Sequence, residues 1–529
     1  MWIHSLTYAR FIDIERSDGK ASKLRAMKIK NRIALPLSLI LLTGLACNTI
    51  AKLGAATATP TAVLSSPEPV FEPTPTFDAP PNPNPGPEGI GDPYFDEMGN
   101  GGYDVGHYEI ALRVDMDADA IASTTTISAT ATQVLTSLNL DFSGLLVTAV
   151  EVNGEDALFQ RVGSELTIYP PEAISAGDAF QIAVNYGGTP GANTSGPQYS
   201  EGWIYYGAGV LVAGEPTGAS TWYPVNEHPA DKATYTFLVN VDKPFEVAAN
   251  GVLKEVQEFD TDWTYVWEMD DPIAPYLVTV AIGDFDLDEY TTPSGVPVRN
   301  YFAVGVSDEV RANFARIGDM ITYFEEVFGS YPFDAFGVVV HDLDLGFALE
   351  TATLVVFGRS FTDEYVVAHE LSHMWFGDSV GLTAWKDIWL NEGFATYAQM
   401  LWSEHVYGRD ALDDEIISNY EQLALYGEII GTEPIGEPGP DNLFRYDIYY
   451  RGALALHALR LKVGDDVFFG ILRAYYERYR DRNAATGDFI AVAEEVSGRQ
   501  LKEFFDAWLY QLELPDIPEM GLSAEDFSE

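Results

Sequence analysis

One short stretch of histidine and glutamate constrains this chain more than any other feature. His369 and His373 stand at positions i and i+4, and Glu370 follows the first histidine. On a helix the two histidines share one face, about 40° apart around the axis and ~6 Å apart along it. Both imidazoles can therefore bind one metal ion, and Glu370 can act as a base toward a water molecule there. Glu392 offers a third ligand and leaves a fourth position open, as catalytic zinc sites require.

The residues around this motif predict a buried helix from 361 to 376. Thr362, Asp363 and Glu364 form an acidic helix start, and the positions that follow are mostly apolar. Burying two histidines and a glutamate without partners is costly, and a metal ion supplies the partner. A chain of this composition should contain only roughly 0.01 such motifs by chance. The sequence therefore favours a metal site over two histidines on a solvated helix face.

Longer runs around the motif carry a family resemblance. Residues 369–378 read HELSHMWFGD, residues 385–395 read WKDIWLNEGFA, and residues 222–235 read WYPVNEHPADKATY. These runs resemble the gluzincin zinc metallo-aminopeptidases of the aminopeptidase N (membrane alanyl aminopeptidase) family. The resemblance implies one zinc ion per chain on His369, His373 and Glu392, with Glu370 as the catalytic base. Asp378 stands where the family usually has Asn, a change that we expect to affect local hydrogen bonding rather than zinc.

Two further glutamates match family positions that bind the substrate's N-terminal ammonium. Glu350 lies in GFALET (346–351), where the family has G-A-M-E-N, and Glu215 lies in GEPTGAS (214–220), where it has E-P-T-A-A-R. The resemblance implies that both carboxylates bind a free amine. Phe347 replaces the first glycine of the G-A-M-E-N segment, so we expect it to reshape the pocket for the first side chain. Without this sequence context, each glutamate would be interpreted as a surface carboxylate.

A tyrosine is the expected donor to the oxyanion of the transition state. Tyr449, in YYRG (449–452), matches the Y-x-K-G segment of the family, and the resemblance implies a catalytic role for it. Tyr450 and Tyr446 stand close by in the sequence and remain alternatives. His341 and His457 are expected to be packing residues rather than ligands.

The N-terminal segment predicts a position outside the cytoplasm. A basic stretch from 23 to 32 is followed by an uncharged, Leu-rich run and then by Cys47, the only cysteine. This order is typical of a bacterial lipoprotein signal in which the cysteine is lipidated. The alternatives are an uncleaved membrane anchor and plain secretion, so the expected location is extracytoplasmic and cell-surface or membrane-anchored. A lone cysteine excludes an internal disulfide.

Composition shifts along the chain predict a multidomain protein. We expect a signal region at 1–47, a disordered Pro/Thr/Ala-rich linker at 48–98 and an N-terminal all-β domain at 99–286. The resemblance implies a thermolysin-like α/β, mainly helical, zinc-peptidase domain at 287–516, followed by a tail at 517–529. Longer relatives carry further C-terminal domains, so we expect a short form of the family.

The expected activity is that of a zinc aminopeptidase acting on peptides with a free N-terminus. An endopeptidase or an epoxide hydrolase on the same zinc site is the first alternative, and a catalytically inactive surface protein that binds peptides is the second. The net charge of −50 argues against nucleic acid as a partner, because such a field repels phosphates.

Overall fold

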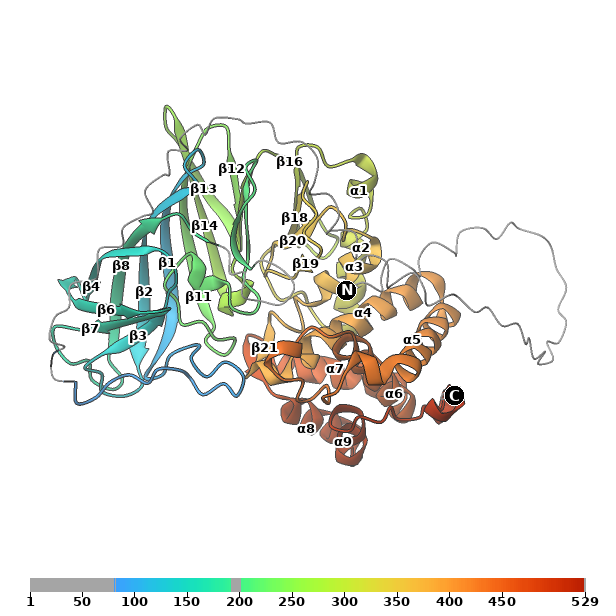
Figure 1. Ribbon diagram of the computed structural model, residues 1–529. Coiled ribbons are helices and arrows are strands. Elements are labelled where there is room, and N and C mark those ends of the chain that lie inside the picture. Colours follow the sequence, from blue (N-terminus) through green and yellow to red (C-terminus); the bar gives the residue numbers. More distant parts are fainter. Residues whose placement is uncertain (1–79, 81, 192–200, 528–529) are drawn as a thin grey trace, which may run out of the picture. The chain divides into compact units, whose positions relative to one another are not determined.

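The computed structural model describes residues 80, 82–191 and 201–527. The signal region at 1–47, with Cys47, and the linker as far as residue 79 lie outside the described residues. Strands come first along the chain and helices later, as Figure 1 shows. This order confirms the predicted fold class, an all-β domain followed by a mainly helical one.

An eight-stranded sheet forms the body of the β domain. In its first strand, buried residues such as Tyr108, Ile110 and Leu112 alternate with more exposed ones, which places the apolar side chains on one face. That strand pairs in parallel with β11 and antiparallel with β2. In sheet order the strands are β13 (Val252–Glu258), β14 (Asp262–Ile273), β11 (Ala233–Asp242), β1 (Tyr103–Asp115), β2 (Ala120–Ala131), β8 (Ala179–Gly188), β4 (Leu146–Val152) and β5 (Glu155–Asp156).

Two smaller sheets complete the β domain. The four-stranded sheet matters most for the site, because its strand β10 ends at Ala213, two residues before Glu215. Its strands are β12 (Glu246–Ala249), β15 (Val280–Gly283), β10 (Val210–Ala213) and β9 (Gly202–Tyr205). The three-stranded sheet contains β3 (Leu138–Asp141), β7 (Glu165–Tyr169) and β6 (Leu158–Val162).

A mixed five-stranded sheet begins the helical domain. Its order is β16 (Phe285–Thr291), β17 (Pro297–Ala303), β18 (Phe336–His341), β20 (Val355–Gly358) and β19 (Ala348–Leu349). Strands β17, β18 and β20 run parallel, and the two outer strands pair antiparallel with them. The boundary expected between residues 286 and 287 falls inside β16, and the predicted domain limits stay a prediction.

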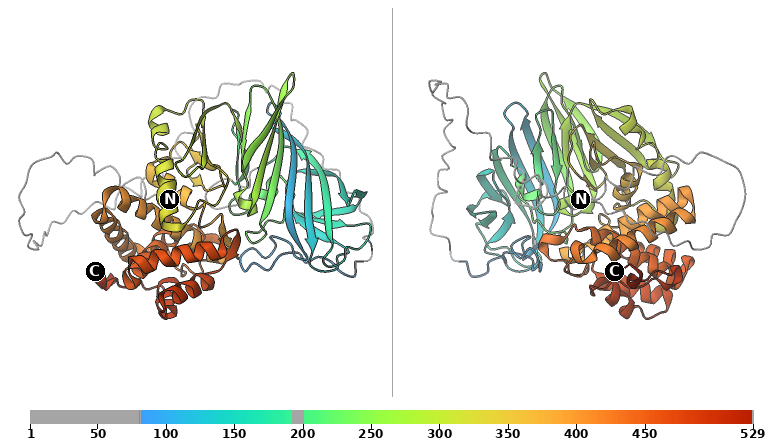
Figure 2. Two further views of the ribbon diagram at one scale, coloured as in Figure 1. Left: turned by 180° about the vertical axis from the view of Figure 1, so that it is seen from behind. Right: turned by 45° about the vertical axis from the view of Figure 1, so that its right-hand side comes forward.

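Helices α1 (Asp308–Ala312) and α2 (Ile317–Phe328) lie between β17 and β18 in the chain and the other helices follow β20; together they gather on one side of the five-stranded sheet, as the views in Figure 2 show. The other helices are α3 (Glu364–Ser372), α4 (Trp389–Tyr407), α5 (Arg409–Ile430), α6 (Tyr446–Val463), α7 (Asp465–Tyr479), α8 (Thr486–Ser497) and α9 (Lys502–Leu509). A two-stranded parallel sheet, β21 (Val380–Leu382) and β22 (Arg482–Ala484), lies among them. Among the described residues, none of the helices combines the length and the apolar character needed to cross a membrane.

The last part of the expected linker is ordered, which corrects the prediction for residues 82–98. Gly86 donates its backbone N–H to Ser137 O at 2.9 Å, and Asp92 is buried. The Asp92 carboxylate accepts the backbone N–H of Trp385 at 3.1 Å and lies 3.2 Å from His228 Nε2. This segment therefore contacts both the β domain and the helical domain. The proline content of this segment predicted a spacer. The contacts that order it could not be predicted, because the partners of Asp92 are remote in sequence.

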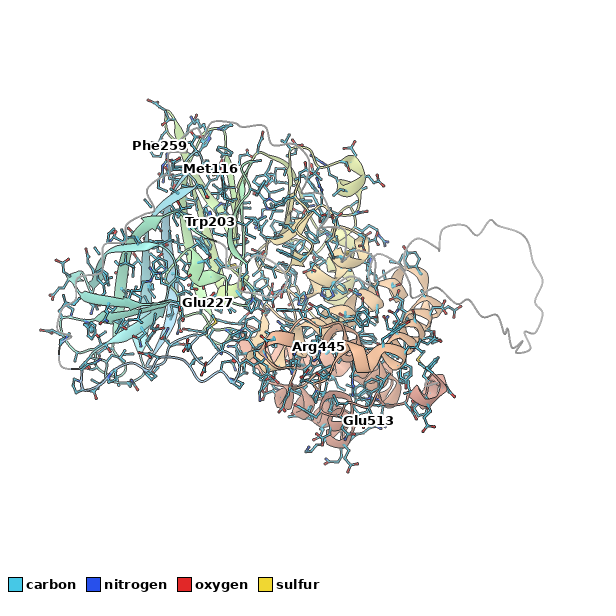
Figure 3. All side chains as sticks on the ribbon, in the orientation of Figure 1. Met116, Trp203, Glu227, Phe259, Arg445 and Glu513 are labelled. Atoms are coloured by element: carbon cyan, nitrogen blue, oxygen red, sulfur yellow. The ribbon has the colours of Figure 1, made fainter. Side chains whose placement is uncertain are left out.

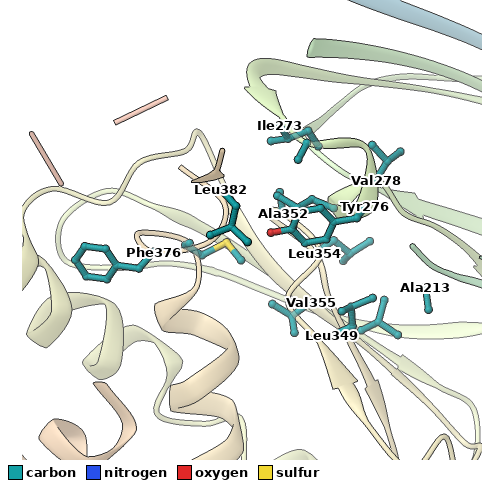
Figure 4. Close-up of a cluster of buried hydrophobic side chains, with 14 of the residues drawn as sticks. Ala213, Ile273, Tyr276, Val278, Leu349, Ala352, Leu354, Val355, Phe376 and Leu382 are labelled. Carbon is teal, nitrogen blue, oxygen red and sulfur yellow. The ribbon is translucent and has the colours of Figure 1, made fainter. Parts of the chain in front are cut away.

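Apolar side chains from both domains meet close to the metal motif. Figure 4 shows Tyr276 among Ile273 and Val278 of the β domain and Leu349 and Leu354 of the segment around β19. All five are buried. In Figure 3, side chains cover both domains, from Glu227 in the β domain to Arg445 at the start of α6. Strand β19, which directly precedes Glu350, lies against α3.

Candidate metal centre

The helix α3 is shorter than its sequence pattern predicts. It begins at Glu364, after Asp363, whose side chain accepts the N–H of Val366 as an N-cap. It ends at Ser372, so His373 is its C-cap residue rather than part of a helix that continues to 376. His369, Glu370 and His373 are all buried. The first and last of these remain on one side of the helix, which keeps the i and i+4 geometry of the motif.

The structure brings the three predicted ligands together. His369 Nε2 lies 3.3 Å from Glu392 Oε2, and His373 Nε2 lies 3.8 Å from the same oxygen. The three ligand atoms all lie within 4.8 Å of one another. Glu392 reaches this point from the first turn of α4, a helix that is buried along most of its length. Two imidazoles and one carboxylate form a donor set that fits zinc.

Contacts to the other ring nitrogens orient both histidines. His369 Nδ1 lies 2.9 Å from Gln399 Oε1, and His373 Nδ1 lies 3.2 Å from Phe376 O. Such contacts fix the tautomer that leaves Nε2 free for a metal. Burial lowers the pKa of His369 and holds the pKa of His373 well below its usual range. Both imidazoles are therefore neutral at pH 7, the form that binds metal.

Three more glutamates surround this point. Ligand atoms of Glu350, Glu370 and His373 lie within 4.8 Å of one another, and so do those of Glu215, Glu350 and Glu392. Glu215 and Glu350 are buried, and each has an Oε1 with no hydrogen-bond partner among the described residues. Burial, reinforced by neighbouring carboxylates, raises the pKa of both. The cluster has an excess of acceptors that a cationic group would satisfy.

Tyr449 is the tyrosine that faces the metal ligands. Its ring stacks on His369 with centroids 6.0 Å apart, and its hydroxyl hydrogen-bonds to the Glu392 carboxylate. Tyr446 and Tyr450, the alternatives from the sequence, instead stack on each other with centroids 4.2 Å apart. The Tyr446 hydroxyl donates to Asn419 Oδ1 at 2.9 Å, on α5.

A glycine contact sets the distance between the helices that carry Glu392 and Tyr449. A Cβ atom on Gly393 of α4 would stand 2.9 Å from the Cα of Gly452, and one on Gly452 would stand 2.8 Å from the Cα of Gly393. Real Cβ atoms do not approach so closely, so the crossing of α4 and α6 requires both glycines. Gly393 directly follows Glu392, in NEG (391–393), and Gly452 lies three residues after Tyr449, in YYRG (449–452).

Contacts that sequence reasoning missed support the site from the β domain. Lys232 Nζ donates to Asp378 O at 2.7 Å and to Ser379 O at 2.8 Å, in the turn after α3. The hydroxyl of Tyr276 accepts from Asn391 Nδ2 at 3.1 Å, next to Glu392. Lys232 and Tyr276 lie far from the metal motif in sequence, so only the fold reveals these contacts. The position of Gln399 could have been predicted, because it lies two helical turns after Glu392 and therefore on the same face of the helix.

The two departures from the family pattern have structural consequences. Asp378 is fully buried, and neither carboxylate oxygen has a partner among the described residues. Burial, reinforced by Glu350 and opposed by Lys232, raises the pKa of Asp378 well above its usual range. Phe347 is half-buried and packs against the hydrophobic core. His341 and His457 are fully buried beside tyrosine hydroxyls and belong to no candidate metal cluster of the described residues.

The fold and the site together define a class of protein. A helix with His-Glu-x-x-His and a glutamate from the following helix are the ligand set of the gluzincin metallopeptidases. Family models agree: the Peptidase M1 N-terminal domain matches residues 105–277, and the Peptidase family M1 domain matches residues 319–508. The chain belongs to peptidase family M1, which confirms the predicted family.

Individual relatives are similar over part of their length. Glutamyl aminopeptidase of Homo sapiens is 29% identical over 338 residues, which cover 59% of this chain and 35% of that protein. Aminopeptidase M1 of Arabidopsis thaliana is 28% identical over 325 residues, covering 57% and 37%. The chain thus spans about a third of the length of these curated relatives.

A solved structure is similar over a larger share of this chain. It is a mutant M1 zinc metallopeptidase of Deinococcus radiodurans bound to a Tyr-Ser-Ala substrate. The TM-score is 0.77 at 29% identity, and the match covers 82% of this chain and all of that one. A second structure, described as a two-domain M1 zinc metallopeptidase mutant bound to L-tryptophan, matches with a TM-score of 0.76. These matches agree with zinc as the metal of this family.

Proposed function

We propose that this chain is a zinc-dependent aminopeptidase that removes the N-terminal residue of peptides, with one zinc ion per chain. The observation that carries the proposal is the pair of buried carboxylates, Glu215 and Glu350, beside the metal ligands. Each has an unpartnered oxygen, which is costly unless a donor group binds there. A substrate ammonium would supply charge-assisted hydrogen bonds to both. An endopeptidase has no need of such a pair.

The residues of the site divide the chemistry among them. His369, His373 and Glu392 would hold zinc, which when bound polarises the scissile carbonyl and acidifies a water molecule. Glu370 accepts the proton of the attacking water and delivers it to the leaving amine. The Tyr449 hydroxyl donates to the oxygen on which negative charge develops.

Substrate binding determines which bond is cut. With the free ammonium held by Glu215 and Glu350, the first peptide bond lies next to Glu370, and bonds further along the substrate do not reach it. The Tyr-Ser-Ala substrate and the L-tryptophan bound in the similar structures support peptides as the substrate class. The side-chain preference of this chain depends on the pocket near Phe347.

The role of Glu370 is tested by Glu370→Gln, which keeps the size of the side chain and removes the base. Hydrolysis of aminoacyl arylamides should fall by a factor of about 10²–10⁴, while zinc content stays at that of the unaltered protein. Glu326→Gln, at an exposed position on α2, is the matched control and should retain full activity. If Glu370→Gln keeps more than half of the activity, Glu370 is not the base.

Free and blocked peptides separate the aminopeptidase from its alternatives. A peptide with a free N-terminus should lose one residue at a time, and its N-acetylated form should remain intact. Glu350→Gln should raise KM for the free peptide at least tenfold, because it removes one charge that binds the ammonium. Cleavage of the acetylated peptide at an internal bond would instead identify an endopeptidase.

We also propose that the enzyme works outside the cytoplasm, attached to a membrane through a lipid on Cys47. The support comes from the sequence alone: a basic stretch, an apolar run and a single cysteine in the order of a lipoprotein signal. Expression in a bacterial host with a labelled fatty acid should transfer the label to the unaltered protein and not to Cys47→Ser. Equal labelling of both proteins would contradict the lipid anchor.

A further inference from the structure

Arg299 is a buried cation without a counter-charge. It lies in β17, its side chain is 7% exposed, and none of its three guanidinium nitrogens has an acceptor among the described residues. Its guanidinium carbon lies 4.8 Å from the centre of the Trp267 ring. Trp267, in β14, is fully buried, and its indole Nε1 also has no partner in the described part of the chain.

The groups around Arg299 do not supply the missing negative charge. Tyr301 and Tyr331 are close enough to be affected by its charge, but burial raises the pKa of both phenols, so they stay neutral. The Tyr331 hydroxyl donates to Ala335 O at 3.1 Å. Glu289 stands opposite Arg299 in the β16–β17 ladder, yet it is exposed and forms no ion pair with Arg299 among the described residues.

This arrangement has donors and lacks acceptors. A guanidinium carries five N–H donors and an indole carries one, and neither can accept a hydrogen bond. Enclosing the cation costs more free energy than one contact with an aromatic ring returns. Burial lowers the pKa of Arg299, and the fields of Tyr301, Tyr331 and Glu289 oppose this shift without reversing it. Arginine nevertheless keeps its proton in proteins, so the charge has to be balanced.

We propose that Arg299, stacked on Trp267, forms a binding site for a small monovalent anion, with chloride as the ligand. One negative charge balances one guanidinium, and a spherical acceptor can take N–H groups from more than one direction. The enclosure by protein selects a small ion over phosphate or a peptide carboxylate. Bound there, the ion ties β14 of the β domain to β17 of the five-stranded sheet. The site lies outside the metal centre and is independent of the proposed peptidase activity.

Thermal unfolding in different salts tests the site in solution. The protein is unfolded in sodium chloride and in sodium gluconate at equal ionic strength, because gluconate is too large to enter. Chloride should raise the midpoint by about 2 °C, in a saturable manner, as expected for an ion that binds the native state. Equal midpoints in the two salts at every concentration would overturn the proposal.

Two variants assign the effect to Arg299. Arg299→Met keeps an unbranched apolar stem over Trp267, and it should remove the difference between the salts. Glu289→Gln is the matched control for the nearest carboxylate, and it should keep the difference. If Arg299→Met does not fold, Arg299→Lys retains the charge without the planar fork, and its chloride midpoint should move at least tenfold higher. An unchanged chloride response in Arg299→Lys, or its loss in Glu289→Gln, would overturn the assignment.

Crystals of the unaltered protein soaked in sodium bromide locate the ion directly. An anomalous peak within hydrogen-bonding distance of the Arg299 guanidinium, together with the chloride effect in solution, supports the site. A water molecule at that position in bromide would overturn it. A peak that appears only at molar bromide, with no solution effect, would show an adventitious ion only and would also count against the proposal.

Discussion

Lys232 offers the sharpest test of how the β domain supports the metal centre. Its ammonium donates to the carbonyls of Asp378 and Ser379, directly after the helix that carries the histidines. The same turn is tied to that helix, because Asp378 N donates to His373 O at 3.0 Å and Ser379 N donates to Met374 O at 3.2 Å. Replacing Lys232 with Met keeps the aliphatic stem and removes both charge-assisted hydrogen bonds.

The magnitude follows from the two carbonyls. A buried acceptor left without a partner costs about 1–3 kcal/mol, so two give a gross loss of about 2–6 kcal/mol. Part of this is offset, because burial lowers the pKa of Lys232 to about 8 and the ammonium itself is costly to enclose. We therefore expect Lys232→Met to lose about 1–3 kcal/mol of stability at pH 7. Relaxation of the turn at His373 should weaken zinc binding by about tenfold, as when other outer contacts to a ligand are lost.

Two measurements check this expectation: the midpoint of urea unfolding, and zinc affinity by competition with a chelator. Lys243→Met is the matched control, since Lys243 Nζ also makes two hydrogen bonds, to Glu258 Oε1 at 2.9 Å and to Phe259 O at 2.6 Å. Those partners are exposed and belong to a hairpin of the β domain. The reasoning is refuted if Lys232→Met binds zinc within twofold of the unaltered protein and unfolds at the same urea concentration.

Three further variants test other parts of the structure. Tyr449→Phe should lower kcat by about 10²–10³ with little change in KM, and an unchanged kcat would contradict an oxyanion donor. Gly452→Ala should destabilise the chain and reduce activity, because its Cβ meets Gly393 at 2.8 Å; a fully active, equally stable variant would show that α4 and α6 can separate at no cost. Burial lowers the pKa of His341 to about 3, below the usual 6.5, so its stabilising effect is full above pH 6.5 and is lost as the pH falls toward 3. Between pH 7 and pH 5 the unaltered protein should therefore lose about 2 kcal/mol more than His341→Gln, measured by urea unfolding at each pH.

The sequence predicted the parts of the site that follow helical spacing. His369, Glu370 and His373 lie on one helix, so their geometry is set by the period of 3.6 residues. Glu215 and Glu350 were indicated by the family resemblance and not by spacing. Each follows a strand of a different sheet, so no helical or strand period relates the two positions.

Partners that depend on tertiary contact could not be predicted. Asp92 sits in a Pro-rich segment whose composition is that of a spacer, and its partner Trp385 is remote in the chain. Lys232 looks like an ordinary surface lysine until the turn after α3 is placed beside it. Arg299 lies in β17 with no feature of the sequence around it to mark it as buried, and only the packing of Trp267 against it shows that its charge is enclosed. These contacts can be predicted only from the three-dimensional fold, because whether a charged side chain is buried depends on the residues packed around it.

The glycines that follow Glu392 and Tyr449 explain why these motifs extend beyond their reactive residues. Tyr449 can hydrogen-bond to Glu392 only if α4 and α6 cross with their backbones in contact. Gly393 and Gly452 permit that crossing, and each stands within three residues of the side chain that it positions. A larger residue at either place would move the tyrosine away from the metal ligands while leaving every reactive group in the sequence. The chemistry of this site therefore depends on two residues that have no side chain at all.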